Sequence, residues 1–124
     1  MRQTARNIII SACSFAVLAG ALMLTAVPAA IAADSAITKG KAVAVDRKKG
    51  NCLACHAMDG GSLPGNIGPP LISMSLRFPD KAKLRAQIYD STTSNPNTIM
   101  PPFGKHGMLS DEEIDQVVEY IYTL

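Results

Sequence analysis

The clearest hydrophobic pattern lies near the end of the chain, where apolar residues recur every three or four positions. The residues with this spacing are Ile114, Val117, Val118 and Ile121. Because positions three and four apart share one face of a helix, the pattern predicts a helix with one apolar side. Ser110 and Glu113 have the spacing of a capping box, which predicts that the helix begins after Ser110.

A second helix is predicted over residues 36–49, with its lysines and arginines exposed and with Val43 and Ala44 facing inward. Gly50 follows as a C-terminal cap. Gly40 and Ala44 are four positions apart and share a face, where small side chains would let another backbone approach closely. The alternative is that they are two ordinary surface positions.

Two shorter helices are predicted in the middle of the chain, over residues 71–78 and 79–90. Pro79 suits the first turn of the second helix, because its missing N–H has no partner to lose there. Leu84 and Ile88 share one face of that helix and are expected to point into the core.

Long loops are predicted between these helices. Residues 60–70 are rich in glycine and proline. Residues 91–109 lack a period, and Asn95-Pro96 and Pro101-Pro102 keep them out of regular structure. Since no stretch shows the alternation of a strand, the predicted class is all-α with long loops.

The first third of the chain predicts an export signal. Two arginines precede a long apolar run, and Ala30-Ile31-Ala32 has the A-x-A pattern of a cleavage site. We therefore predict a signal peptide at 1–32 and one domain at 33–124, periplasmic and without membrane attachment after cleavage. The alternative is an uncleaved membrane anchor over 8–33.

Removal of this signal would leave a domain without net charge. Two of the twelve lysines and arginines lie in the signal, so ten remain beside ten aspartates and glutamates. No basic run with interleaved aromatic residues occurs, so nucleic-acid binding is not expected. A domain of this length without tryptophan has few residues for a core, and a large apolar cofactor would complete it.

Cys52-Leu53-Ala54-Cys55-His56 is the most specific motif. C-x-x-C-H predicts covalent attachment of one haem c: Cys52 and Cys55 add to the two vinyl groups, and His56 binds the iron on the proximal side. Cys13 would be removed with the signal. The residues before it resemble a lipoprotein box only faintly, because the preceding apolar stretch is too short.

Three other interpretations of this motif lack the context they need. A thioredoxin-like redox pair would require a βαβ unit, which the pattern does not predict. A zinc site would require two further ligands, but His106 is the only other histidine. The third alternative is a chance occurrence in an exported helical chain.

The Gly68-Pro69-Pro70-Leu71 segment is a candidate neighbour of the haem. A histidine that binds a metal usually gives its second ring nitrogen a hydrogen-bond partner, which fixes the tautomer and the ring orientation. We predict that the Pro69 carbonyl is the partner of His56. A plain turn is the alternative.

Met100, which two prolines follow, is predicted to be the second axial ligand of the iron. Ligation by histidine and methionine suits electron transfer. Met108 and His106 are the competing candidates. Met58 is too near the attachment motif to reach the opposite face of the haem, and Met74 is expected to pack in the core.

Together these motifs resemble those of class I cytochromes c. The shared features are the C-x-x-C-H motif, Gly68-Pro69-x-Leu71, Met100-Pro101 and the C-terminal helix that ends in Tyr120-Ile121. The resemblance implies the fold of that class, in which helices and long loops surround one covalently bound haem.

A closer resemblance is to SoxX, the monohaem subunit family of the sulfur-oxidation cytochrome SoxAX. It rests on the segments 50–56 and 65–71 and, more particularly, on Asn95-Pro96-Asn97-Thr98 with the Met100-Pro101-Pro102-Phe103-Gly104 that follows. The similarity extends from Lys39 to Leu124.

That resemblance implies a heterodimer with a SoxA-like cytochrome subunit. The pair would act as an L-cysteine S-thiosulfotransferase, which attaches thiosulfate to a cysteine of a carrier protein. This chain would contribute no catalytic residue and would pass electrons to a downstream cytochrome. The alternative is a free-standing electron-shuttle cytochrome in another respiratory chain. A haem enzyme or gas sensor would need an open iron position, which Met100 would close.

Overall fold

The structure is a computed structural model that describes residues 29–124, with side chains from residue 33 onward. The predicted signal peptide 1–32 therefore lies almost wholly outside the described residues. The helical elements, where η marks a short 3-10 turn, are α1 (Ala29–Val45), η1 (Cys52–Ala54), α2 (Met74–Arg77), α3 (Lys81–Tyr89), η2 (Ser91–Thr93) and α4 (Asp111–Ile121). None of the helices described is long and apolar enough to cross a membrane.

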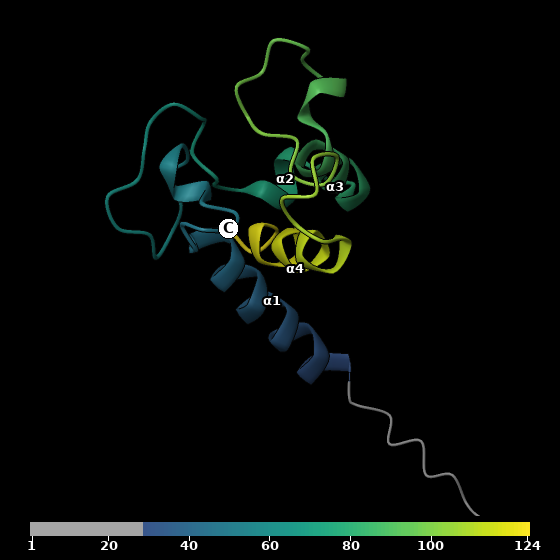
Figure 1. Ribbon diagram of the computed structural model, residues 1–124. Coiled ribbons are helices and arrows are strands. Elements are labelled where there is room, and N and C mark those ends of the chain that lie inside the picture. The colour runs from purple at the N-terminus through teal and green to yellow at the C-terminus, as the bar shows by residue number, and fades with distance from the viewer. Residues whose placement is uncertain (1–28) are drawn as a thin grey trace, which may run out of the picture.

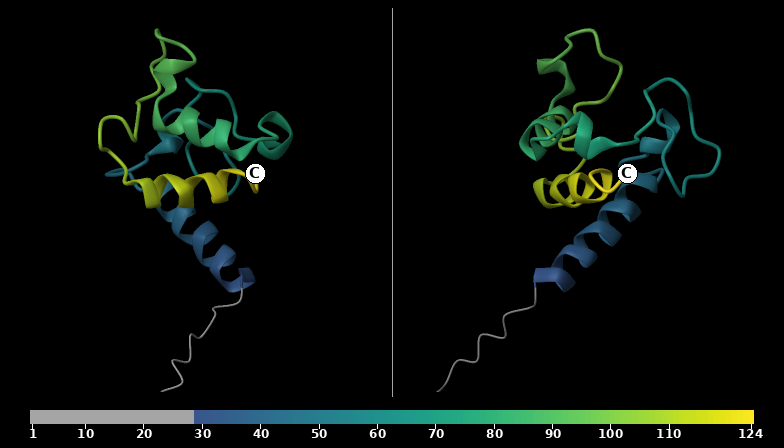
Figure 2. Two further views of the ribbon diagram at one scale, coloured as in Figure 1. Left: turned by 90° about the vertical axis from the view of Figure 1, so that its right-hand side faces the viewer. Right: turned by 180° about the vertical axis from the view of Figure 1, so that it is seen from behind.

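Helices α1 and α4 cross in close contact (Figures 1 and 2). A methyl group on Gly40 would lie 1.9 Å from the carbonyl oxygen of Gln116 and 3.0 Å from Cβ of Tyr120, so only glycine fits at this crossing. Ala44, one turn further along α1, is fully buried. The close approach of another backbone is confirmed, and the neighbour is α4.

The helix predicted over 36–49 begins earlier, at Ala29, and ends earlier, at Val45. The Asp46 carboxylate accepts a hydrogen bond from the Lys48 N–H at 2.8 Å, and such a bond competes with helix continuation. The Gly50 N–H donates to the Val43 carbonyl at 3.1 Å. The predicted glycine therefore satisfies a carbonyl at the end of the helix.

Helix α4 forms as predicted. The Glu113 N–H donates to Oγ of Ser110 at 3.2 Å, and the Ser110 N–H donates to the Glu113 carboxylate at 3.0 Å, which completes the capping box. The predicted apolar face is buried together with Tyr120. Arg85 of α3 pairs with Asp111 and Asp115 across the contact between α3 and α4, at 2.7 and 2.6 Å.

Helix α3 is shorter than predicted, and Pro79 lies before it rather than in its first turn. Asp80 is the N-cap, since its carboxylate accepts a hydrogen bond from the Ala82 N–H at 2.9 Å. Leu84 and Ile88 are buried, as their spacing predicted.

The helix predicted over 71–78 is reduced to the four residues of α2. Leu71 instead pairs with Met58 in an isolated bridge, the one β interaction found between residues 29 and 124. The Leu71 N–H donates to the Ala57 carbonyl at 2.8 Å, which holds this part of the chain extended. The 91–109 segment is irregular as predicted, apart from the short turn η2.

Candidate haem site

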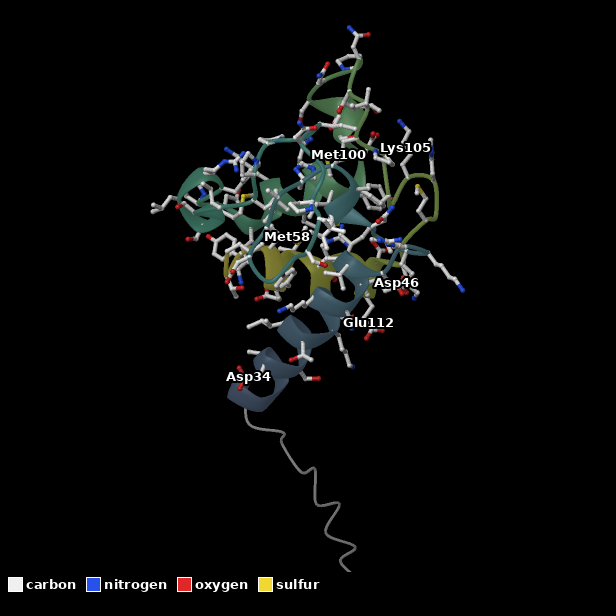
Figure 3. All side chains as sticks on the ribbon, turned by 90° about the vertical axis from the view of Figure 1, so that its left-hand side faces the viewer. Asp34, Asp46, Met58, Met100, Lys105 and Glu112 are labelled. Atoms are coloured by element: carbon white, nitrogen blue, oxygen red, sulfur yellow. The ribbon has the colours of Figure 1, made fainter. Side chains whose placement is uncertain are left out.

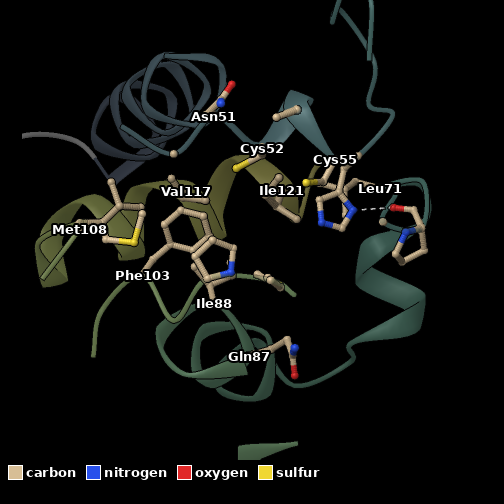
Figure 4. A pocket seen from close by; sticks show the side chains of 18 of the residues that line it. Asn51, Cys52, Cys55, Leu71, Gln87, Ile88, Phe103, Met108, Val117 and Ile121 are labelled. Carbon is tan, nitrogen blue, oxygen red and sulfur yellow. Dashed lines mark hydrogen bonds between the residues drawn. The ribbon is translucent and has the colours of Figure 1, made fainter. Parts of the chain in front are cut away.

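A cavity of about 610 Å³ lies between the η1 segment, α3, α4 and the loop that contains Met100 (Figure 4). This volume is in the range of cofactor sites. Eight of the fourteen buried apolar residues of the core line it: Leu71, Met74, Leu84, Ile88, Phe103, Leu109, Val117 and Ile121. More than half of the buried apolar residues therefore line this cavity.

Cys52 and Cys55 both line this cavity, and neither forms a disulfide. Figure 4 shows their sulfur atoms along one wall. The turn η1 brings them together, because the Cys55 and His56 N–H groups both donate to the Cys52 carbonyl, at 3.1 and 2.9 Å. Burial raises the pKa of the free Cys52 thiol to about 11. A thiol with so high a pKa is a poor redox nucleophile, which counts against a thioredoxin-like pair.

The His56 ring is held by one hydrogen bond of defined direction. Its Nδ1 lies 2.7 Å from the Pro69 carbonyl oxygen (Figure 4, dashed line). A carbonyl can only accept, so Nδ1 carries the proton and Nε2 has the free lone pair. An Nε2 lone pair on a ring fixed in this way is the arrangement that metal-binding histidines use.

Three backbone hydrogen bonds fasten the loop that carries Pro69 to the cysteine motif. The N–H groups of Gly65, Gly68 and Leu71 donate to the carbonyls of Leu53, Cys55 and Ala57, each at 2.8 Å. A methyl group on Gly68 would lie 2.4 Å from Cε1 of His56. The imidazole therefore packs directly on the backbone of this glycine.

Arg77 adds a side-chain contact to the same loop. Its Nη1 donates to the Pro70 carbonyl at 2.8 Å and to the sulfur of Met74 at 3.3 Å. Met74 is almost completely buried, as expected for a core residue, and its sulfur already has a donor.

The structure separates the candidates for the second axial ligand. Met100 and Met108 both line the cavity, Met100 half-buried and Met108 exposed. His106 is exposed and does not line the cavity. Met58 does not line it either. It lies at a different level of the molecule from Met100 (Figure 3), where the Tyr120 hydroxyl contacts its sulfur at 3.7 Å. Two of the predicted candidates therefore remain in reach of a cofactor.

Among residues 33–124, the charged side chains that line the cavity are all basic: Arg47, Lys48, Lys49, which also pairs with Glu113, and Arg77. This charge suits a cofactor that carries carboxylates, as the two propionates of haem do. Two thiols on one wall, an imidazole with a free Nε2, a thioether and a basic rim form a donor set that fits haem c.

Several residues at the site were missed by reasoning from sequence. Ser91 and Thr98 hydrogen-bond the backbone of Met100, and Arg77 holds the Pro70 carbonyl. The proline pairs are the sequence signal that could have pointed to these hydrogen bonds. A proline carries no N–H, so the chain beside it must find its hydrogen bonds elsewhere.

A family model described as cytochrome C oxidase, cbb3-type, subunit III matches residues 35–121. The chain belongs to this cytochrome c family. The family implies a covalently bound haem c and the role of an electron carrier.

One relative and one solved structure extend this result. The chain is 40% identical over 76 residues to an uncharacterized lipoprotein of Aquifex aeolicus (strain VF5), a match that covers 60% of this chain and 37% of the lipoprotein. The chain thus spans little more than a third of that relative's length. The Cys13 position considered above as a faint lipoprotein box lies outside the described residues.

A chain in the crystal structure of SoxXA from P. pantotrophus superimposes with a TM-score of 0.63 at 26% identity. The match covers 69% of this chain and 79% of that one. The predicted all-α class I cytochrome c fold is confirmed, and so is the resemblance to SoxX.

Proposed function

We propose that this chain is an exported monohaem c-type cytochrome that carries electrons as the X subunit of a SoxAX-like complex in thiosulfate oxidation. The observation that carries the proposal is the 2.7 Å contact between Nδ1 of His56 and the Pro69 carbonyl, beside two unpaired thiols on one cavity wall. This arrangement leaves Nε2 of His56 free for iron.

Each predicted site residue has a distinct task in this proposal. Cys52 and Cys55 would hold one haem c through thioether bonds, and Nε2 of His56 and the sulfur of Met100 would be the ligands of its iron. Bound haem supplies a reversible one-electron change at its iron. With His56 and Met100 both bound, the iron would have no open position for a substrate, and the chain would only transfer electrons.

Two observations support the sulfur-oxidation role. A SoxXA chain is a structural match, and Asn95-Pro96-Asn97-Thr98 resembles the particular segment of SoxX. The partner is a SoxA-like subunit, and a downstream cytochrome accepts the electrons. Thiosulfate chemistry needs a reactive sulfur or an open metal site. A cysteine in a thioether has no thiolate, so this chain alone performs none of it.

Export is part of the proposal. The signal peptide 1–32 directs the chain to the periplasm, and the domain 33–124 has no membrane attachment after cleavage. The pattern Ala30-Ile31-Ala32 supports cleavage there.

A free-standing electron shuttle is the second candidate. The family model favours this second candidate, because its description names an oxidase subunit rather than a sulfur-oxidising protein. In that case the chain would donate electrons within another respiratory chain without a permanent SoxA-like partner.

The first test is haem attachment. The full chain, expressed in the periplasm with a c-type cytochrome maturation system, should carry one haem that remains with the polypeptide under denaturing conditions. Its mass should equal that of residues 33–124 plus one haem. A chain without covalent haem would overturn the proposal.

The second test separates the two roles. Purification of the tagged protein from its native periplasm should recover a second cytochrome subunit in equal amount. Mixed with thiosulfate, carrier protein and an electron acceptor, both chains together should turn over and this chain alone should not. A holoprotein that is recovered without a partner would favour the free-standing shuttle.

A further inference from the structure

Ser91 is the only buried polar residue in the described part of the chain, and its side chain is fully enclosed. It opens η2, two residues after the end of α3. Its hydroxyl donates to the Met100 carbonyl at 2.7 Å, across nine positions of sequence. Buried hydroxyls need a partner, and this bond supplies it by linking η2 to the loop of the proposed iron ligand.

The backbone donors Gly104 and Lys105, which bond the Tyr89 carbonyl, lie four and five positions after Met100. Pro101 and Pro102 lack N–H groups, so two consecutive positions after Met100 have nothing to donate. Met100 is held by two hydroxyls instead: Ser91 donates to its carbonyl, and Oγ1 of Thr98 accepts from its N–H at 3.1 Å. We call Ser91 and Thr98 the hydroxyl clamp.

The clamp is anchored in a fixed part of the fold. Leu84 and Ile88 bury α3 in the core, and the Asp90 carboxylate accepts a hydrogen bond from the Thr92 N–H at 3.1 Å, which fixes η2. The backbone of Met100 is therefore tied to η2, which follows α3, as well as to its own loop. Supporting hydrogen bonds of this kind hold a ligand in its productive geometry.

We propose that the hydroxyl clamp positions Met100 for the iron and thereby sets how readily an external ligand displaces its sulfur. This inference rests on the proposed function, in which Met100 is the second axial ligand. An external ligand binds only those molecules in which Met100 has moved away. Its apparent affinity is therefore the intrinsic affinity reduced by the open fraction.

The test titrates the oxidised, haem-loaded protein with imidazole. Ser91→Ala should increase the apparent affinity by about tenfold, the effect of one lost hydrogen bond on the closed form. Thr98→Val, which has nearly the same shape, removes the other hydroxyl and should act in the same direction even if Ser91→Ala fails to fold. Thr93→Ala is the matched control, because this hydroxyl on the same turn donates to the Asp90 carbonyl at 2.7 Å and has no bond to Met100.

The same substitutions in a Met100→Ala background decide whether the clamp acts through the ligand. There, the clamp variants should leave the imidazole affinity unchanged. An equal increase in both backgrounds would overturn the inference, since the hydroxyls would then only control access to the cavity.

The two proposals fail in different ways. A wild-type affinity in Ser91→Ala and Thr98→Val, with Met100→Ala still opening the iron, overturns the clamp and leaves the proposed function standing. If Met100→Ala itself binds imidazole like the wild type, Met100 is not the iron ligand, and the proposal for the hydroxyl clamp is wrong as well.

Discussion

Two proline pairs border the haem cavity, and they support the two proposed iron ligands in different ways. Pro69-Pro70 lies beside His56, and Pro101-Pro102 follows Met100. In the first loop, a carbonyl contacts the ligand ring itself at 2.7 Å, and backbone N–H groups fasten the surrounding chain to the cysteine motif. In the second loop, the hydrogen bonds to the ligand residue reach its backbone, where the Ser91 hydroxyl donates to the Met100 carbonyl and the Thr98 hydroxyl accepts from the Met100 N–H.

This difference predicts that substitutions near His56 and substitutions near Met100 have different effects. The His56 ring is fixed at its own nitrogen and packs against Gly68, so its geometry is set before any metal arrives. The hydrogen bonds that hold Met100 reach its backbone, and its half-buried side chain only packs against the core, so we expect that its sulfur can leave the iron while the fold persists. We therefore expect changes near His56 to alter stability, and changes near Met100 to alter ligand binding and potential.

Loss of covalent haem should affect the His56 side and the Met100 side of the site together, because both residues are proposed to bind its iron. The double variant Cys52→Ala, Cys55→Ala is expected to be largely unfolded or molten, because eight core residues would line an unfilled cavity. Far-UV circular dichroism during heating measures this. A cooperative melt at the wild-type temperature would contradict it.

Gly68→Ala should break the proximal side specifically. The new methyl group would lie 2.4 Å from Cε1 and 2.6 Å from Nδ1 of His56, so the ring must shift, which disturbs its hydrogen bond to the Pro69 carbonyl. We expect a loss of about 2 kcal/mol in the free energy of unfolding of the holoprotein, as overpacked sites show. Ser62→Ala, at an exposed position of the same loop, is the control and should leave stability unchanged. Equal melts for the two variants would show that the ring does not depend on Gly68.

Met100→Ala should leave the fold intact and change the iron. A thioether favours the ferrous state, so its removal should lower the reduction potential by an amount on the order of 0.1 V, a part of the range that axial ligands cover. The reduced protein should also bind carbon monoxide. Met108→Leu is the matched control, and an effect in that variant alone would make Met108 the ligand.

The smallest expected effect is the pH dependence of the Met100 side. A hydrogen bond with Lys105, together with those from Thr92, holds the pKa of Asp90 below its usual range. A lowered carboxylate pKa contributes stability above about pH 4, its unfolded value, and loses it as the pH falls through the lower folded value. The Lys105 ammonium lies 2.8 Å from the Asp90 carboxylate, and backbone bonds from Gly104 and Lys105 to the Tyr89 carbonyl close the same loop.

Acidification below this pH should therefore weaken the bond between the Met100 sulfur and ferric iron, which the long-wavelength absorption band reports. Asp90→Asn should show a weaker band already at neutral pH and a flatter acid response. Glu119→Gln, whose carboxylate pairs with Lys81 on the contact between α3 and α4, is the control. Identical acid profiles for Asp90→Asn and the wild type would rule out Asp90 as the group responsible.

Local sequence determined much of this protein. The capping box of α4 and its apolar face, the burial of Leu84 and Ile88, and the loops around the proline pairs depend on residues a few positions apart. The cysteine motif is equally local, and the family match agrees with the haem that it predicts. Helix ends were less accurate where a side chain such as Asp46 or Asp80 competed for backbone hydrogen bonds.

Tertiary structure alone decided which partners these local elements meet. Gly40 contacts the backbone of Gln116, Arg77 reaches the Pro70 carbonyl, and Ser91 reaches Met100. Such contacts leave no periodic mark in the sequence, because they depend on where separate segments lie after the chain has folded. The serine that holds the proposed iron ligand is therefore visible only in the folded molecule, although the prolines beside Met100 create the need for it.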